Sequence, residues 1–182
     1  QKVITLSRRL PDAERLAWAD QLLANMKGRR PKNRPEVYAE QARFIDENPT
    51  EKLVLQTLRI GNLGITTLPN EVYSITGLKL KARSPFPATF NIELANGAAG
   101  YIPPPHQHEL GGYTTWPART AGLEVDAEPK IVETLLSSLE SLAGKPRREP
   151  APFHGAYANA ILDEKPLAYW RCEEFEGNRL AD

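Results

Sequence analysis

Glu71 is the acid of this chain whose position best suits metal chemistry. It follows Leu68-Pro69-Asn70, where an expected strand ends and an expected helix begins. Asn70 tolerates a positive φ, so a tight turn is expected there. A carboxylate at the carboxyl end of a strand can bind a metal ion, because α/β folds build their sites at that edge. A carboxylate at a helix start is also favoured for a structural reason, since it faces unpaired amide donors. The sequence leaves both interpretations open.

Tyr101 and Arg59 each have a functional and a structural interpretation. Tyr101 follows a loop of small residues, 96–100, which would let the backbone approach a ligand or a neighbouring segment closely. It is either a site residue beside that loop or a tyrosine that packs at a strand end. Arg59 is either a charge at a strand edge or a site residue.

A second possible metal site lies at His106 and His108, because imidazole nitrogens bind zinc. Residues two apart on a strand share one face, so the two rings could chelate an ion with the adjacent Glu109. The alternative is a polar surface loop after the three prolines 103–105. The third histidine, His154, has no partner at ligand spacing.

Composition excludes several classes of protein. Lys plus Arg and Asp plus Glu both number 23, and this balance argues against a nucleic-acid-binding protein, which should carry a basic excess. No apolar run reaches the roughly 20 residues that span a bilayer, so we expect no transmembrane segment. The single cysteine, Cys172, excludes an internal disulfide framework. The sequence contains no phosphate-binding loop, nucleophile elbow or dinucleotide turn. Because the chain begins at Gln1 without Met, we expect it to be processed or cut from a longer protein.

Hydrophobic spacing predicts an α/β (α+β) fold with an incomplete mixed sheet and flanking helices. Helices are expected over residues 11–27, with Pro11 as the first helical residue, and over 35–48, 71–82 and 126–142. Strands are expected on both sides of Gly61-Asn62, as a hairpin, and over 88–94. The expected buried side of the second helix consists of Val37, Tyr38, Ala42 and Ile45. The expected buried side of the last helix consists of Ile131, Leu135, Leu139 and Leu142.

The composition changes after the last expected helix. Residues 144–152 (GKPRREPAP) are rich in proline and charge and lack periodicity, which is typical of a linker. Residues 153–182 follow, with a strand candidate at 167–171. Thirty residues cannot bury a core alone, so we expect an orphan β segment that is docked on the first part or truncated.

The stretch from Arg59 to Tyr101 resembles the neutral, non-lysosomal ceramidases and their bacterial relatives. RIGNLGI at 59–65 and LPNE at 68–71 are similar to the family's R-I-G-D-L-x-I and x-P-G-E motifs, and Gly77 keeps the family's glycine six residues after the acid. LAN at 94–96 and GYI at 100–102 are similar to its L-x-N and x-Y-I/V segment. The resemblance covers about residues 5–143, so residues 1–143 would be the C-terminal portion of that hydrolase domain.

The resemblance implies a zinc amidohydrolase. The family binds one zinc ion through two histidines, a glutamate and a tyrosine, and Glu71 and Tyr101 match the last two. The zinc would activate a water and polarise the amide carbonyl of an N-acyl lipid such as ceramide. Asn70 replaces the motif's glycine, and the short segment before Tyr101 is similar to a bacterial subgroup whose substrate need not be ceramide.

The same resemblance implies that this chain needs a partner. The family's two histidine ligands and catalytic serine belong to an earlier part of the domain, and the histidines present here do not match them. The chain alone should therefore neither hold zinc tightly nor hydrolyse an amide. Its expected partner is the missing N-terminal part of the same domain.

The C-terminal residues 153–182 resemble the truncated start of a laminin G-like (concanavalin A-like) jelly roll. YANAIL at 157–162, KPLAYWR at 165–171 and Glu174 are similar to its V-L-x-x-x-P-x-A-Y-W-R-x-x-E opening. Such domains bind glycans or proteins, which implies a secreted or extracytoplasmic parent. The alternative function is a non-catalytic binding protein with a ceramidase-like scaffold and a glycan- or protein-binding jelly roll. Upstream histidine ligands would discriminate the two.

Overall fold

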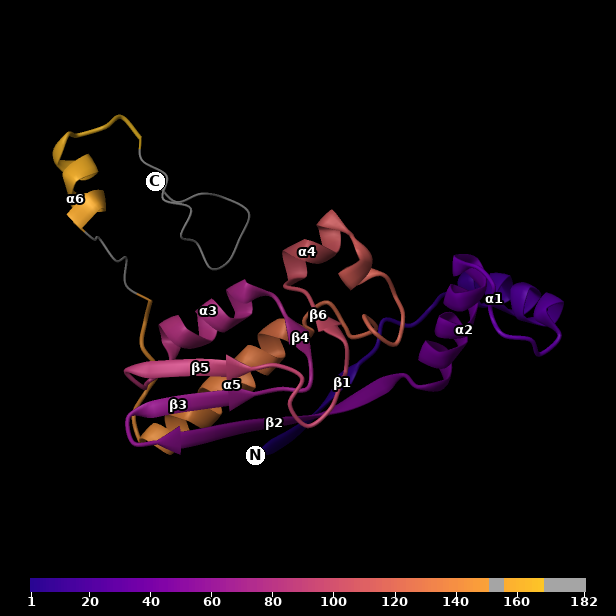
Figure 1. Cartoon of the computed structure of the whole chain (residues 1–182), viewed down its shortest axis with the longest axis horizontal. Helices are drawn as coiled ribbons and strands as arrows, with labels where there is room; N and C mark the ends of the chain where they lie inside the picture. The colour runs from indigo at the N-terminus through magenta and orange to yellow at the C-terminus, as the bar shows by residue number, and fades with distance from the viewer. Residues whose placement is uncertain (151–155, 169–182) are drawn as a thin grey trace.

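A four-stranded mixed sheet organises the chain, in the order β1-β2-β3-β5 (Figure 1). Its strands are β1 (Lys2–Ser7), β2 (Thr50–Ile60), β3 (Leu63–Thr67) and β5 (Ala88–Ile92). The first three are antiparallel neighbours, whereas β5 runs parallel to β3. The α/β class expected from the sequence is confirmed. The computed structural model describes residues 1–150 and 156–168.

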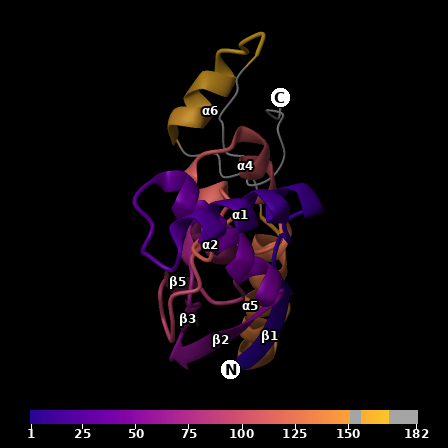
Figure 2. The same cartoon turned by 90° about the vertical axis from the view of Figure 1, so that its right-hand side faces the viewer.

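Two helices cover one face of this sheet and bury the main core. Helix α5 (Ala127–Ala143) packs on β2, and α3 (Ser74–Arg83) packs on β5 and α5. Figure 2 shows β3 and β5 on one side and α5 on the other. The fully buried side chains of this core include Leu53, Leu55, Leu80, Ile131, Leu135, Leu136 and Leu139. Three of the four residues predicted for the inner face of α5 are therefore confirmed, and Leu142 is the exception, because 39% of it is exposed in the last turn.

A helical hairpin of α1 (Ala13–Met26) and α2 (Arg34–Glu47) projects from one end of the sheet (Figure 1). Its small core is made by Ala19, Ala39 and Ala42, with Trp18 packed beside them. Asp12 Oδ1 accepts a hydrogen bond of 2.7 Å from Arg15 N, which makes Asp12 the N-cap. The helix therefore begins at Ala13, and the prediction of Pro11 as its first residue is wrong.

The buried side of α2 differs from the prediction at Val37, which is 41% exposed. Glu36 is buried in its place, because its carboxylate accepts hydrogen bonds from the Arg29 guanidinium at 2.7 and 2.8 Å and from Lys32 N at 2.7 Å. These bonds lower the pKa of Glu36 to about 2, with the Arg29 bond as the largest cause. A carboxylate can be buried when it is paired in this way. Glu36 therefore holds the basic loop before α2, although the spacing of apolar residues in the helix would place it on the exposed side.

The β2–β3 hairpin around Gly61-Asn62 forms as predicted. Arg59 lies near its tip, where Nε donates to Gly61 O at 2.8 Å and Nη1 to Leu142 O at 3.4 Å, so the structure favours its interpretation as a strand-edge charge. The third helix begins at Ser74, and Glu71 belongs to the short strand β4 (Glu71–Val72). The interpretation of Glu71 as a helix-start acid is therefore wrong.

The C-terminal segment is described only in part. Residues 156–163 form α6 (Ala156–Asp163), which the sequence analysis did not predict. Of the strand candidate at 167–171, Leu167 and Ala168 are described and are not in a strand, and the rest lies outside the described residues. In the described part of the chain, no helix combines the length and the apolar character needed to cross a bilayer.

Truncation of Leu135 tests the core. We expect Leu135→Ala to lower the free energy of unfolding by about 2–5 kcal/mol, because a fully buried leucine is replaced by a cavity. Leu142→Ala on the same helix is the control and should cost less than about 1 kcal/mol. Urea unfolding followed by circular dichroism measures both, and equal losses would contradict this account of the core.

Candidate functional site

Two short strands bring Glu71 and Tyr101 together. Strand β4 (Glu71–Val72) pairs in parallel with β6 (Tyr101–Ile102), and Glu71 lies opposite Tyr101 in the register. Glu71 N donates to Gly100 O at 3.1 Å. Residues that face each other on paired strands project to the same side, so the carboxylate and the phenol share one side of this pair.

Asn70 holds the segment before Glu71 to the loop before Tyr101. Its side chain is fully buried, and Nδ2 donates to the carbonyls of Ala99 and Gly100, both at 3.2 Å. Ala99 N donates to Pro69 O at 2.6 Å. The chain bends at Pro69 and Asn70, between β3 and β4, but Asn70 does not have a positive φ. The asparagine acts instead as a double donor that fixes the loop against β4.

Gly100 allows the closest backbone contact at the site. Its φ is +78°, and a Cβ at this position would lie 2.3 Å from Thr120 O. Tyr101 N donates to the same carbonyl at 2.8 Å. A side chain at position 100 would therefore push apart the two segments that set the position of Tyr101.

Glu71 and Tyr101 line an open pocket of about 390 Å³. The other lining residues are Val72, Tyr73, Glu93, Gly111, Gly112, Tyr113 and Thr114. The Tyr101 and Tyr113 rings meet edge to face at 5.5 Å, and the Tyr73 hydroxyl lies 2.8 Å from Thr114 Oγ1. The pocket therefore offers two carboxylates and three phenols, which are oxygen ligands for a cation.

Sequence reasoning missed Glu93, Tyr73 and Tyr113. Glu93 falls within the strand expected over 88–94, but β5 ends at Ile92 and Leu94 has a φ of +51°. Glu93 Oε2 instead accepts a hydrogen bond from Val72 N at 3.2 Å, beside Glu71. No spacing in the sequence connects these residues, because three separate segments carry them.

The electrostatics of the pocket keep Tyr101 protonated. Burial raises the pKa of the Tyr101 phenol, and the negative charge of Glu71 and the neighbouring Tyr113 raise it further. A cation held between the two side chains would have the opposite effect, because it favours the phenolate. The paired oxygens thus fit two ligands of a metal ion. Among residues 1–150 and 156–168, no three His, Cys, Asp or Glu side chains gather as a complete metal site.

The local metal site considered at His106, His108 and Glu109 does not form. These residues lie in helix α4 (Pro105–Leu110), with Pro105 at its start, so neither a strand nor a surface loop is present. Residues two apart on a helix do not face each other. His108 Nδ1 is buried without a hydrogen-bond partner in the described part of the chain. Burial and the positive charge of Arg9 lower the pKa of His108. His154 lies outside the described residues.

Neither a comparison with protein-family models nor one with curated protein sequences finds a match for this chain.

Alanine at Gly100 tests the packing of the site. We expect Gly100→Ala to lower the free energy of unfolding by more than about 2 kcal/mol, since the backbone must move away from Thr120. Gly144→Ala is the control, because Gly144 also has a positive φ, +65°, but its Cβ would meet no atom within 4 Å. The control should cost about 1 kcal/mol. Equal losses in urea unfolding would contradict the close contact.

Titration of Tyr101 tests the electrostatics of the pair. In Glu71→Gln the negative charge beside the phenol is lost, so we expect the pKa of Tyr101 to fall toward its ordinary value. The Tyr101 pKa is obtained from the ultraviolet difference between each protein and its Tyr101→Phe variant as pH rises. Glu109→Gln, on α4, is the control and should leave it unchanged. An unchanged or higher Tyr101 pKa in Glu71→Gln would contradict the pairing.

Proposed function

We propose that residues 1–143 are the C-terminal part of a zinc-dependent amidohydrolase domain resembling the neutral ceramidases, in which Glu71 and Tyr101 are two of four zinc ligands. One observation carries the proposal: Glu71 lies opposite Tyr101 in the β4–β6 pair. The resemblance assigns Glu71 and Tyr101 from two separate sequence motifs, which carry no information on the distance between the residues. That both line one pocket supports their assignment to one site.

The chemistry assigns a role to each side chain. Zinc, when bound, would activate water and polarise the amide carbonyl of an N-acyl lipid or a related substrate. Glu71 would supply a carboxylate oxygen. Burial and Glu71 raise the pKa of the Tyr101 phenol, and a cation bound in the pocket would favour the phenolate. The ring of Tyr113, at 5.5 Å, restricts the orientation of Tyr101.

The proposal needs a partner segment. The resemblance implies four protein ligands for the zinc ion, and Glu71 and Tyr101 would be two of them. The histidine ligands and the catalytic serine would come from the N-terminal part of the same domain. This chain alone would therefore be inactive. The linker at 144–152 and the laminin G-like segment at 153–182 would connect the hydrolase to an extracytoplasmic binding module.

Zinc content of the full-length gene product tests the proposal. We expect the native protein to bind one zinc ion per chain and to cleave a fluorescent N-acyl amide. Glu71→Gln and Tyr101→Phe should each lower zinc occupancy after dialysis by about 10-fold or more, because one of four ligands is lost. Elemental analysis measures the occupancy.

Two matched variants serve as controls for zinc content. Glu93→Gln and Tyr73→Phe make the same chemical changes in the same pocket but leave the proposed ligands Glu71 and Tyr101 in place, so both should retain zinc. If Glu71→Gln and Tyr101→Phe bind zinc as well as these controls, the assignment of ligands is wrong. A full-length protein without zinc would favour the non-catalytic binding protein.

A further inference from the structure

The sheet face opposite α3 and α5 is largely apolar and partly exposed, although Ile65 and Thr67 at its centre are buried. The register aligns Leu58 with Ile65, and Ile65 with Phe90, across three neighbouring strands. We call this surface the open face, and its apolar members are Val3, Val54, Leu58, Ile60, Leu63, Ile65, Phe90 and Ile92. Leu58, Ile60, Phe90 and Ile92 have exposed fractions of 51%, 66%, 40% and 41%.

The open face carries little charge. The same side of β2, β3 and β5 also carries the neutral residues Gln56, Thr67 and Ala88, and its one charged member is Lys52, at the end of β2 far from the β2–β3 turn. A sheet face in water normally alternates with the buried face and is polar. Strands buried on both faces instead have continuous apolar runs, such as Leu53-Val54-Leu55 in β2. The pattern is therefore that of a sheet covered on both sides.

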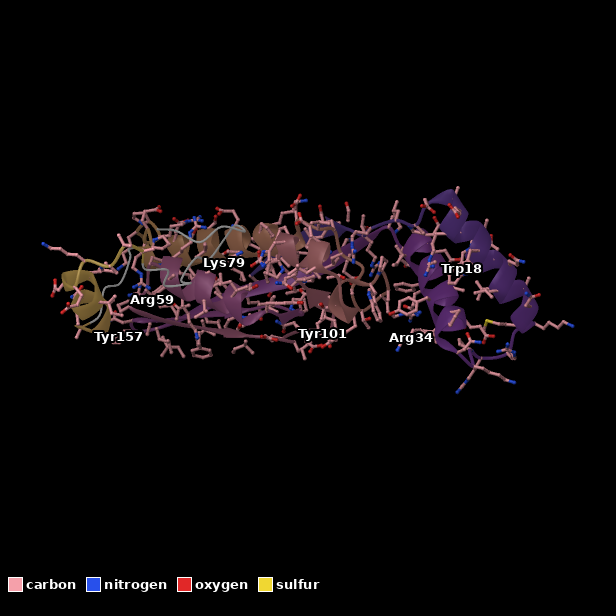
Figure 3. The ribbon with its side chains drawn as sticks, turned by 90° about the horizontal axis from the view of Figure 1, so that it is seen from above. Trp18, Arg34, Arg59, Lys79, Tyr101 and Tyr157 are labelled. Carbon is pink, nitrogen blue, oxygen red and sulfur yellow. The ribbon has the colours of Figure 1, made fainter. Side chains whose placement is uncertain are left out.

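The open face is continuous with the pocket of Glu71 and Tyr101. Gln56, on the open face, accepts a hydrogen bond of 2.7 Å from Asn96 Nδ2. Asn96 belongs to the loop 93–100 that Asn70 fixes beside Glu71. Figure 3 shows Lys79 on the helical side of the sheet and Tyr101 toward the opposite side. A layer that covers the open face would therefore reach the rim of the pocket.

We propose that the open face packs against an apolar layer formed by the N-terminal part of the same hydrolase domain. This inference rests on the proposed function, because it identifies the segment that carries the missing zinc ligands with the segment that covers the sheet. A second copy of this chain fits less well, since it would bring another Glu71 and Tyr101 to the pocket and no histidine at a matching position. One layer thus completes both the core and the metal site.

Cysteine accessibility in the full-length gene product tests the inference. In a background with Cys172→Ser, Leu58→Cys and Phe90→Cys probe the open face. Leu142→Cys is the control, because Leu142 is exposed by 39% on the helical side and Phe90 by 40%. The rate of maleimide labelling is measured for each variant and divided by its rate in guanidinium. We expect the two open-face cysteines to react at least about 10-fold more slowly than Cys at position 142, because they react only after local opening.

The outcomes separate this inference from the zinc assignment. The labelling is repeated after zinc removal with a chelator and in Glu71→Gln. Protection that persists without zinc supports the covered face even if zinc binding fails. Labelling of Leu58→Cys as fast as Leu142→Cys overturns the inference. Protection that disappears on dilution, with a dimer in sedimentation, also overturns it, because the covering layer is then a second copy.

Discussion

The buried side chain of Asn70 is the constraint on which the site depends. Its two hydrogen bonds to the carbonyls of Ala99 and Gly100 connect the end of β3 to the loop before β6. A buried amide without these partners would cost about 1–3 kcal/mol, so the loop and the strand are strongly coupled. Gly100 makes the coupling possible, because only a residue without a side chain fits against Thr120 O. Glu71 and Tyr101 lie opposite each other because Asn70 and Gly100 fix the two segments that carry them.

The sheet and the pocket are incomplete in the same way. The inner face of the sheet has a dense core under α5, whereas the open face exposes apolar side chains such as Leu58, Ile60 and Phe90. The pocket likewise offers Glu71 and Tyr101 with Glu93 as a further carboxylate on its lining, and no three His, Cys, Asp or Glu side chains gather as a metal site among the described residues. The proposed additional layer of polypeptide would account for both features, and this is the main physical argument for the proposal.

Local patterns predicted most of the elements, and long-range pairing accounts for what was missed. The apolar stripe of α5 and the Gly61-Asn62 turn are signals within a few residues of sequence, so both elements were predicted. Strands β4 and β6 have two residues each and no periodicity, so their pairing could not be seen. Glu36 was missed because its burial depends on Arg29 across a loop. The helix at His106 was missed because prolines 103–105 suggested an irregular segment, although proline is favoured in the first turn of a helix.

The most direct measurement is X-ray diffraction from crystals of the full-length gene product at the zinc absorption edge. Our account predicts an anomalous peak between the Glu71 carboxylate and the Tyr101 hydroxyl, with both oxygens about 2 Å from the ion. The remaining ligands should come from the layer that covers the open face. A zinc-replete crystal with no peak at this position, and with the Tyr101 hydroxyl bonded directly to Glu71, would contradict the assignment of a metal site to this pair.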